Sequence, residues 1–216
     1  MNEILQKRIE KFKNIDIYPV ISSEFCNKRP PVQILKDIAA GGAKIVQLRE
    51  KNMTKNEIFH LAMEYRQITN WFDMLLIIND HVDIALAVKA DGVHLGQDDL
   101  PLVAARMASK KLIFGSSTHN MQEAIEAIND GASYINVGPI YETQTKEVGY
   151  DAVGLEQFKQ INDQIDIPVT VMGGIKEHHI AELKAHGAKR IAMVTEITMC
   201  DDVTNKVQAL RDLIIN

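Results

Sequence analysis

Charged and polar side chains follow short apolar runs at seven places in this 216-residue chain. The seven segments are QLREK at 47–51, ND at 79–80, GQDD at 96–99, SSTH at 116–119, YETQTK at 141–146, MGGI at 172–175 and VTEI at 194–197. Among them, Arg49, Lys51 and Lys146 offer cations, and Asp80 and Asp99 offer carboxylates. Cations beside hard oxygen ligands favour the binding of a polyanion together with a divalent metal ion.

Two kinds of anion site are predicted from these segments. The oxygen ligands of Asn79, Asp80 and Asp99 suit Mg²⁺, which takes one or two carboxylates, several waters and substrate phosphate oxygens. The Gly-Gly pair ending at Gly174 and the Val-Thr pair beginning at Val194 suit a phosphate monoester, because backbone N–H groups can approach it closely. We therefore expect one metal-assisted pocket and one pocket made of backbone.

Eight apolar or β-branched runs alternate with helix-like patterns along the chain. The expected strands begin at Ile17, Lys44, Met74, Gly92, Lys111, Tyr134, Pro168 and Arg190. The expected helices span 32–40, 55–69, 82–89, 102–108, 121–129, 155–162, 177–185 and 203–214. This alternation predicts an α/β fold, a (βα)8 TIM barrel of parallel strands and crossover helices. The charged amphipathic stretch at 1–14 adds an N-terminal helix, and residues 1–216 are expected to form a single domain.

A barrel would bring the seven polar segments together, because the loops after the carboxyl ends of the strands form one face. The opposite strand ends follow the segments AGGAK, KADG, DGA and AHGA, which are typical of turns and helix caps with glycine in the left-handed conformation. An open doubly wound sheet is the alternative. Its G-x-G-x-x-G signal after the first strand is absent here, which favours the barrel.

The composition excludes several classes of partner. A formal charge of -5 and a pI near 5.8 give no broad attraction for nucleic acid or for an anionic membrane surface. The longest apolar runs are too short to cross a bilayer, and the N-terminal stretch does not resemble a signal peptide. Cys26 and Cys200 lie far apart in the sequence, which suits a reducing compartment. We expect a cytoplasmic protein that acts on small molecules, and a homo-oligomer is compatible with the sequence.

Each site feature taken alone has a simpler interpretation. Arg49 and Lys51 could belong to a solvated loop, and Asp80 and Asp99 could cap the helices that follow them. Polar residues at strand ends could be hydrogen-bonded groups that fill the barrel mouth, and the hydroxyls and glycines could serve only their turns. The coincidence of such features at seven successive strand ends favours a functional site.

The chain resembles the thiamine phosphate synthase family. The likeness rests on VQLREK, IINDHVDIALAVKADGVHLGQDDLP, GSSTH, GPIYETQTK, GLE, VMGGI and AMVTEI, and it extends from about 18 to 197. It implies a transferase that joins a hydroxymethylpyrimidine diphosphate to a thiazole phosphate, giving thiamine phosphate and pyrophosphate. It implies pyrimidine diphosphate binding by Gln47, Arg49, Lys51, Asn79, Ser117 and Lys146, a Mg²⁺ cofactor on Asp80 and Asp99, and thiazole phosphate binding by Thr143, Gly174, Val194 and Thr195. Thr145 is a further expected substrate-binding residue.

The resemblance also implies a dissociative displacement. The pyrimidine methylene loses pyrophosphate to give a stabilised cation, and Arg49, Lys51 and Lys146 act as catalytic residues that stabilise the departing charge. Two departures from the family pattern bear on the site. His81 stands where arginine is frequent, and Glu196 in VTEI adds negative charge beside the expected phosphate pocket, where it would weaken phosphate binding.

Two other functions stay open at this point. One is an isomerase similar to thiazole tautomerase, with His119 as the acid-base group. The other is a non-catalytic barrel that binds a phosphorylated metabolite. The cations and carboxylates argue against the isomerase, because proton transfer on a monophosphate needs no diphosphate site. His94 is expected to be a hydrogen-bonded interior residue, and His178 and His179 are expected on the surface.

Overall fold

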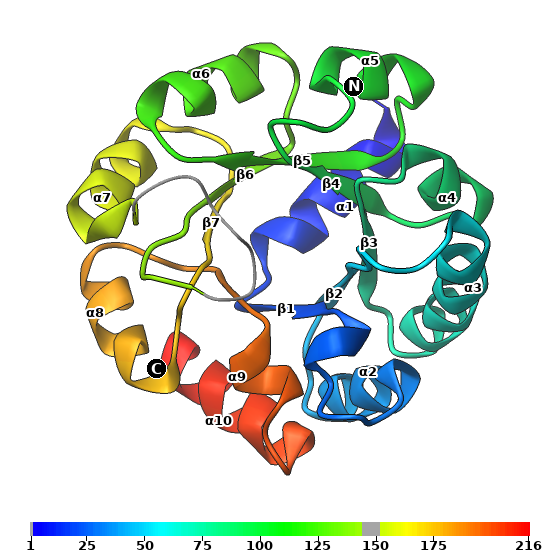
Figure 1. Cartoon of the computed structure of the whole chain (residues 1–216). Helices are drawn as coiled ribbons and strands as arrows, with labels where there is room; N and C mark the ends of the chain where they lie inside the picture. Colours follow the sequence, from blue (N-terminus) through cyan, green and yellow to red (C-terminus); the bar gives the residue numbers. More distant parts are fainter. Residues whose placement is uncertain (1, 144–151) are drawn as a thin grey trace.

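The computed structural model describes residues 2–143 and 152–216 and shows eight parallel strands closed into a barrel (Figure 1). Each strand pairs with its sequence neighbours, and the last pairs with the first. The strands are β1 Ile17–Ile21, β2 Ile45–Leu48, β3 Leu75–Asn79, β4 Gly92–Leu95, β5 Ile113–Thr118, β6 Tyr134–Val137, β7 Val169–Val171 and β8 Ile191–Met193. The predicted (βα)8 barrel is confirmed, and the doubly wound alternative is wrong.

Helices follow the strands and surround the barrel, and one further helix precedes the first strand (Figure 1). They are α1 Glu3–Lys13, α2 Pro31–Ala40, α3 Lys55–Trp71, α4 Val82–Ala87, α5 Leu102–Ala108, α6 Met121–Asn129, α7 Gly154–Gln164, α8 Ile180–Ala185, α9 Thr195–Thr198 and α10 Val203–Ile215, with 3₁₀ turns η1 Ser23–Phe25 and η2 Glu177–His179. The predicted bounds of α5 and α6 match. The expected helix at 177–185 divides into η2 and α8, and the short α9 was not predicted. In the part of the chain that the structure describes, none of the helices has the length and apolar character needed to span a membrane.

Side chains cap the amino-terminal ends of four of the described α-helices, α1, α3, α6 and α10. Thr54 caps α3 in a reciprocal arrangement with Glu57, which satisfies the first free backbone N–H groups. Glycines have positive φ in three of the four predicted cap segments, at 42, 131 and 187. The prediction is wrong for KADG, where Lys89 takes the left-handed conformation with φ of 55°. Gly92 instead lies in β4, where an added Cβ would be 2.3 Å from a side-chain carbon of Ile113.

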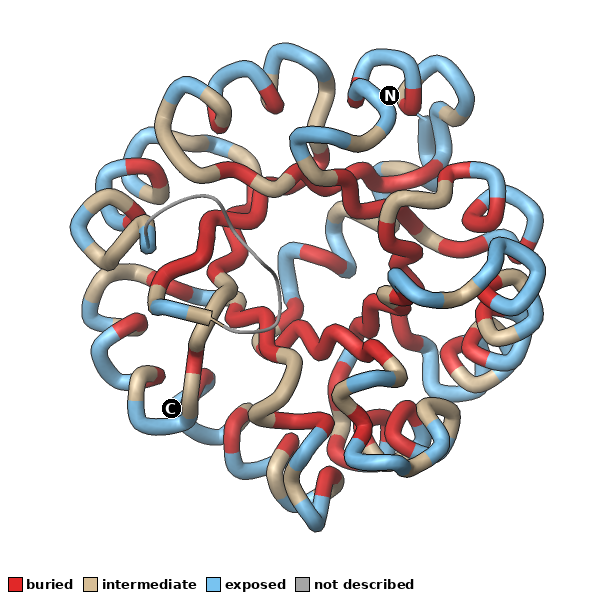
Figure 2. The backbone as a smooth tube through the Cα atoms, in the orientation of Figure 1, coloured by how far each residue is buried: buried red, intermediate tan, exposed pale blue. Residues whose placement is uncertain are grey.

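Side chains inside the barrel change from apolar to polar toward the carboxyl ends of the strands. Residues two apart in a strand point to the same side, so every second residue of each strand points into the barrel interior. Along β2 the series is Ile45, Gln47 and then Arg49, and along β3 it ends at Asn79. The apolar members form a small interior core, distinct from the larger core between the strands and the helices. Buried segments accordingly follow the strands in Figure 2.

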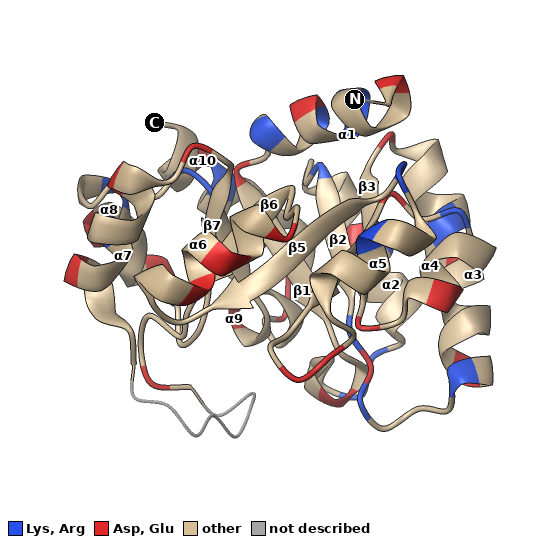
Figure 3. Ribbon diagram, turned by 90° about the horizontal axis from the view of Figure 1, so that it is seen from above, with Lys and Arg blue, Asp and Glu red and all other residues tan. Residues whose placement is uncertain are grey.

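Helix α1 lies across the amino-terminal end of the barrel, as the side view shows (Figure 3). Its residue Phe12 is 1% exposed and stacks on Tyr134 of β6, with ring centroids 4.1 Å apart. Arg8 of the same helix forms an ion pair with Asp91, which precedes β4, at 3.1 Å. The predicted N-terminal helix is therefore an integral part of the barrel, because it fills the end opposite to the polar strand ends.

Candidate active site

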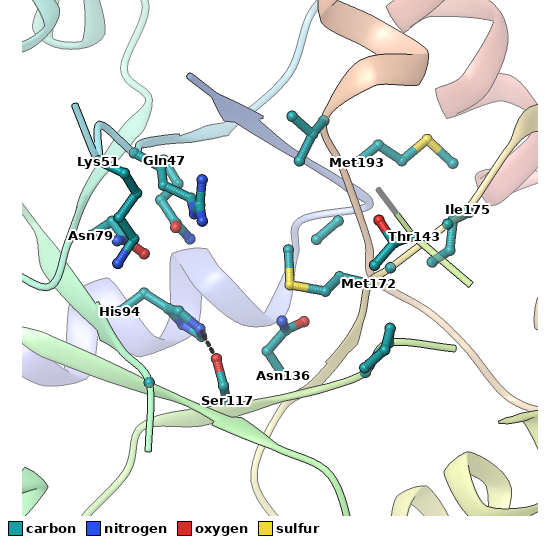
Figure 4. Close-up of a pocket in the computed structure, with 18 of the residues that line it drawn as sticks. Gln47, Lys51, Asn79, His94, Ser117, Asn136, Thr143, Met172, Ile175 and Met193 are labelled. Atoms are coloured by element: carbon teal, nitrogen blue, oxygen red, sulfur yellow. Dashed lines mark hydrogen bonds between the residues drawn. The ribbon is translucent and has the colours of Figure 1, made fainter. Parts of the chain in front are cut away.

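A pocket opens at the carboxyl ends of the strands, and its wall is polar on one side and apolar on the other (Figure 4). Ten residues expected in the site line it: Gln47, Arg49, Lys51, Asn79, Asp80, Asp99, Ser117, Thr143, Gly174 and Val194. Thr195 begins α9 next to Val194 and is not among the lining residues. Thr145 and Lys146 lie outside the described residues. The structure thus gathers residues from seven different strand ends, as the barrel prediction required.

Two carboxyl groups meet in this pocket. Asp80 follows β3 and Asp99 follows β4, and their side chains lie within hydrogen-bonding reach of each other. Burial, and then the neighbouring Asp99 carboxyl, raise the pKa of Asp80. Lys51 opposes this rise from the β2 loop, with its Nζ 2.6 Å from Asp80 Oδ2. Two carboxylates that lie together in a partly buried place repel each other, so a cation relieves the repulsion.

The interpretation of these aspartates as helix caps is wrong. The N-cap positions of α4 and α5 are His81 and Pro101, and neither makes a side-chain cap hydrogen bond. Asp99 Oδ2 instead accepts from Gly96 N at 2.7 Å, which folds the loop after β4 back toward the pocket. Asp80 has φ of 62°, a left-handed conformation that aspartate tolerates at some cost. Such strain is common where a side chain must point into a functional site.

The loop after β2 is fixed by the loop after β1. Ser22 Oγ donates to the carbonyl oxygen of Arg49 at 2.5 Å, and Arg49 Nη1 donates to Ser22 Oγ at 3.4 Å. The next residue, Glu50, is buried and accepts from Ser23 N at 2.9 Å and from Ser23 Oγ at 2.6 Å. Burial raises the pKa of Glu50. The solvated-loop interpretation is therefore wrong for Arg49, whereas the Lys51 side chain is 44% exposed at the rim.

The backbone after β7 approaches its neighbours closely. Gly174 has φ of 64°, and an added Cβ would lie 2.3 Å from the carbonyl oxygen of Glu142. Gly173 is equally restricted, since a Cβ there would lie 2.4 Å from Pro139. Both glycines line the pocket with Val194 after β8. A side chain at either glycine would push the loop after β7 away from the loop after β6, so these positions need glycine.

Glu196 forms ion pairs with two lysines, one of which, Lys206, it shares with Glu177. Its carboxylate lies 3.4 Å from Nζ of Lys176 and 3.2 Å from Nζ of Lys206. A carboxylate surrounded in this way repels a phosphate far less than an unpaired one. The ion pairs reduce the electrostatic cost that the sequence assigned to Glu196.

Several pocket residues were not predicted as site residues. His94 of β4 is 5% exposed, and its Nε2 is 3.0 Å from Ser117 Oγ (Figure 4). Asn136 of β6 lines the pocket and accepts from Thr170 Oγ1 at 2.6 Å. Met172 and Met193 form part of the apolar wall. The alternation along β4 and β6 could have identified His94 and Asn136, because each stands at an inward position next to the strand end.

His119, which follows β5, also lines the pocket. Its Nδ1 is 2.7 Å from Glu123 Oε2, and its backbone N–H donates to the same oxygen at 2.9 Å. Glu123 therefore fixes the imidazole in one orientation. The surface prediction for His178 and His179 can be refined, because His179 stacks on Tyr141 with ring centroids 3.9 Å apart.

The closed barrel with a polar pocket at the carboxyl ends of its strands places the chain among TIM-barrel proteins. A solved 3-hexulose-6-phosphate synthase shares this fold with a TM-score of 0.65 at 16% identity, covering 93% of this chain and 100% of that one. At that identity the likeness concerns the fold alone.

More similar proteins identify the family. A family model described as thiamine monophosphate synthase matches residues 17–197. Thiamine-phosphate synthase of Caldicellulosiruptor saccharolyticus is 36% identical over 210 residues, covering 97% of this chain and 95% of the relative. That of Pelotomaculum thermopropionicum is 42% identical over 200 residues, covering 92% of each. The solved thiamine phosphate pyrophosphorylase from Pyrococcus furiosus has a TM-score of 0.85 at 32% identity, covering 93% of this chain and 95% of that one. The chain belongs to the thiamine monophosphate synthase family.

Proposed function

We propose that this chain condenses a hydroxymethylpyrimidine diphosphate with a thiazole phosphate, releases pyrophosphate and forms thiamine phosphate in a Mg²⁺-dependent reaction. The observation that carries the proposal is the meeting of Asp80 and Asp99 in the same pocket as Arg49 and Lys51. Family membership gives the reaction, and this charge arrangement gives the chain's own means of performing it.

The residues present fit Mg²⁺. Among the described residues, no group of three or more histidine, cysteine, aspartate or glutamate side chains could hold a metal ion. Mg²⁺ usually takes only one or two carboxylates and completes its shell with waters and substrate phosphate oxygens. Asp80 and Asp99 would hold it, and bound there it would neutralise charge on a diphosphate.

The cations of the β2 loop would bind the diphosphate. Arg49 is oriented by Ser22, so its guanidinium needs little reorganisation when negative charge develops on the leaving group. Lys51 forms an ion pair with Asp80 in this structure and could contact both the carboxylate and a phosphate oxygen. Lys146 would supply a third cation from the segment after β6. Together these residues would stabilise the bond-breaking transition state, and no protein nucleophile is required.

The polar strand ends would bind the pyrimidine diphosphate. Gln47, Asn79 and Ser117 lie at inward positions of β2, β3 and β5, next to the cations. The thiazole phosphate would lie across the pocket at Thr143, Gly174 and Val194, with Thr145 and Thr195 as further ligands. Positioning the thiazole nitrogen against the pyrimidine methylene would supply much of the remaining rate enhancement.

The decisive experiment is a mass-spectrometric assay for thiamine phosphate from the two purified substrates, with Mg²⁺ or with excess EDTA. We expect product with Mg²⁺ and loss of product with EDTA, restored by added Mg²⁺. A protein that forms no thiamine phosphate under either condition contradicts the proposed reaction, and one insensitive to EDTA contradicts the metal dependence.

The same assay tests the two alternatives. An isomerase would convert a thiazole phosphate without the pyrimidine, and His119 with its Glu123 partner would be the group to substitute. A non-catalytic barrel would bind the thiazole phosphate and return it unchanged. The single domain and the cytoplasmic location stay predictions.

A further inference from the structure

A continuous series of hydrogen-bonded side chains crosses the barrel interior beneath the pocket. Gln47 Nε2 donates to Tyr18 Oη at 3.0 Å, and Tyr18 Oη is 3.0 Å from Tyr134 Oη. Tyr134 Oη is 3.0 Å from His94 Nδ1, and His94 Nε2 is 3.0 Å from Ser117 Oγ. The two ends of this relay, Gln47 and Ser117, both line the pocket.

The direction of the relay follows from its first member. An amide nitrogen can only donate, so Tyr18 Oη accepts from Gln47 and must place its own hydrogen elsewhere. Among the described residues, Tyr134 Oη is its other hydrogen-bond partner, so Tyr18 donates to Tyr134. Tyr134 then donates to His94 Nδ1. His94 Nδ1 is an acceptor, so its Nε2 carries the hydrogen and donates to Ser117 Oγ.

The middle of the relay is held rigidly. Tyr18 and Tyr134 are fully buried, and burial is the main cause that raises the pKa of both, so each keeps its hydroxyl hydrogen. The ring of Tyr134 lies between Phe12, on which it stacks, and Gly115 of β5. A Cβ at Gly115 would lie 2.0 Å from Cζ of Tyr134, so the position of the ring depends on a glycine there.

We infer that Tyr18, Tyr134 and His94 are positioning residues that make Ser117 a hydrogen-bond donor and Gln47 a hydrogen-bond acceptor toward the pocket. Ser117 Oγ receives a hydrogen from His94 Nε2 and directs its own hydrogen at a ligand acceptor. Gln47 gives an N–H to the relay and presents Oε1 to a ligand donor. The relay therefore selects a ligand with a donor, such as an exocyclic amino group on a heterocycle, near Gln47 and an acceptor oxygen near Ser117. This inference rests on the proposed function, because an aminopyrimidine diphosphate has both groups.

The first test is the tautomer of His94, measured by nitrogen-15 NMR on histidine-labelled wild-type protein. The signal is assigned by its loss in His94→Gln. We expect hydrogen on Nε2 and none on Nδ1, and this state should become mixed in Tyr134→Phe. A wild-type His94 with hydrogen on Nδ1 overturns the inference, since the relay would then run in the opposite direction. The measurement needs no activity, so it stands even if the proposed reaction is wrong.

The second test compares two matched variants in the condensation assay. Tyr134→Phe removes one hydroxyl from the relay and should lower kcat/KM for the pyrimidine diphosphate by about tenfold, the usual effect of one lost hydrogen bond. Tyr65→Phe removes an equally buried hydroxyl that donates to the carbonyl of Pro31 and should leave kcat/KM unchanged. Equal kinetics in the two variants overturn the inference. If Tyr134→Phe fails to fold, Tyr18→Phe replaces it with the same expected loss.

Discussion

The two ends of the barrel treat charge in opposite ways. At the amino-terminal end, Asp91 accepts from Arg8 at 3.1 Å and from Arg66 at 2.7 Å. At the carboxyl end, Asp80 lies beside a second carboxyl group, and a single exposed lysine offsets the repulsion only in part. The amino-terminal end, which α1 covers, holds carboxylate and arginine charges in ion pairs. The carboxyl end holds two neighbouring carboxyl groups, which favour the binding of a cation.

This difference assigns the charges at the amino-terminal end of the barrel to stability and those at the carboxyl end to ligand binding. A paired carboxylate that also accepts a backbone hydrogen bond stabilises the fold, because removing it leaves partly buried arginine charge without that partner. A carboxylate beside another carboxylate lowers stability and raises affinity for a cation. The same chemical change, aspartate to asparagine, should therefore have opposite consequences at the two ends.

The largest expected effect is the loss of activity in Asp80→Asn. Asparagine keeps the left-handed backbone conformation of Asp80 and removes its charge. We expect kcat/KM for the condensation to fall by about 100-fold or more, the scale seen when one electrostatic contact to the transition state is lost. The measurement is steady-state turnover over a range of Mg²⁺ concentrations. Turnover within a few-fold of wild type would show that the carboxylate has no role in the reaction.

The second effect is a loss of stability in Asp91→Asn. Asp91 forms ion pairs with Arg8 and Arg66 and accepts from Leu76 N at 3.0 Å, so asparagine removes the charge from both ion pairs. We expect the free energy of unfolding to fall by about 2–3 kcal/mol. Activity under folding conditions should stay as in wild type. Chemical denaturation monitored by circular dichroism measures the free energy of unfolding, and the condensation assay measures activity. A fall in turnover with unchanged stability would contradict the division between the two ends.

The barrel and most of the site were predictable for one physical reason. Parallel strands bring their carboxyl ends together, so segments as distant as those at Gln47 and Val194 had to share one face. The fold then needs only the alternation of strands and helices, which the apolar runs show directly. The family resemblance assigned roles to residues within that face.

What the sequence did not predict depends on contacts across the barrel. Tyr18 and Tyr134 look like ordinary core aromatics in the sequence. The role of their hydroxyls shows only in the structure, where residues from five strands form one series of hydrogen bonds. The same is true of Glu196, which looked like a repulsive charge until the structure placed Lys176 and Lys206 against it. Local patterns do not contain these distances, because every partner comes from a different element.

The third effect is a gain in stability for Asp80→Asn that depends on pH. Because the pKa of Asp80 is raised on folding, the folded chain holds that proton more tightly than the unfolded chain does. The ionised carboxylate therefore costs stability as pH rises above about 3.9, the value for an unfolded aspartate. Without Mg²⁺, the variant should be more stable than wild type by on the order of 1 kcal/mol at neutral pH, with partial compensation by Lys51.

Thermal unfolding of both proteins across the acidic to neutral range measures this difference. It should vanish below the unfolded pKa, and Mg²⁺ should stabilise wild type more than the variant at neutral pH. A variant less stable than wild type at neutral pH in EDTA would mean that the ion pair with Lys51 outweighs the repulsion from Asp99.

The smallest expected effect is a change in KM in Glu196→Gln, which removes a charge that already has lysine partners at the open end of the barrel. Removing this carboxylate takes one ion pair from Lys176 and one from Lys206, and Lys206 keeps its ion pair with Glu177 at 2.9 Å. The local charge near Val194 therefore becomes more positive. We expect KM for the thiazole phosphate to fall by about two- to threefold at low salt and kcat to stay unchanged, since partly screened pairs contribute less than about 1 kcal/mol. Glu126→Gln on the exposed side of α6 makes the same change in net charge away from the pocket and should leave KM unaltered. A rise in KM for Glu196→Gln would mean that the carboxylate orients the two lysines toward phosphate, which would make it a contributor to binding.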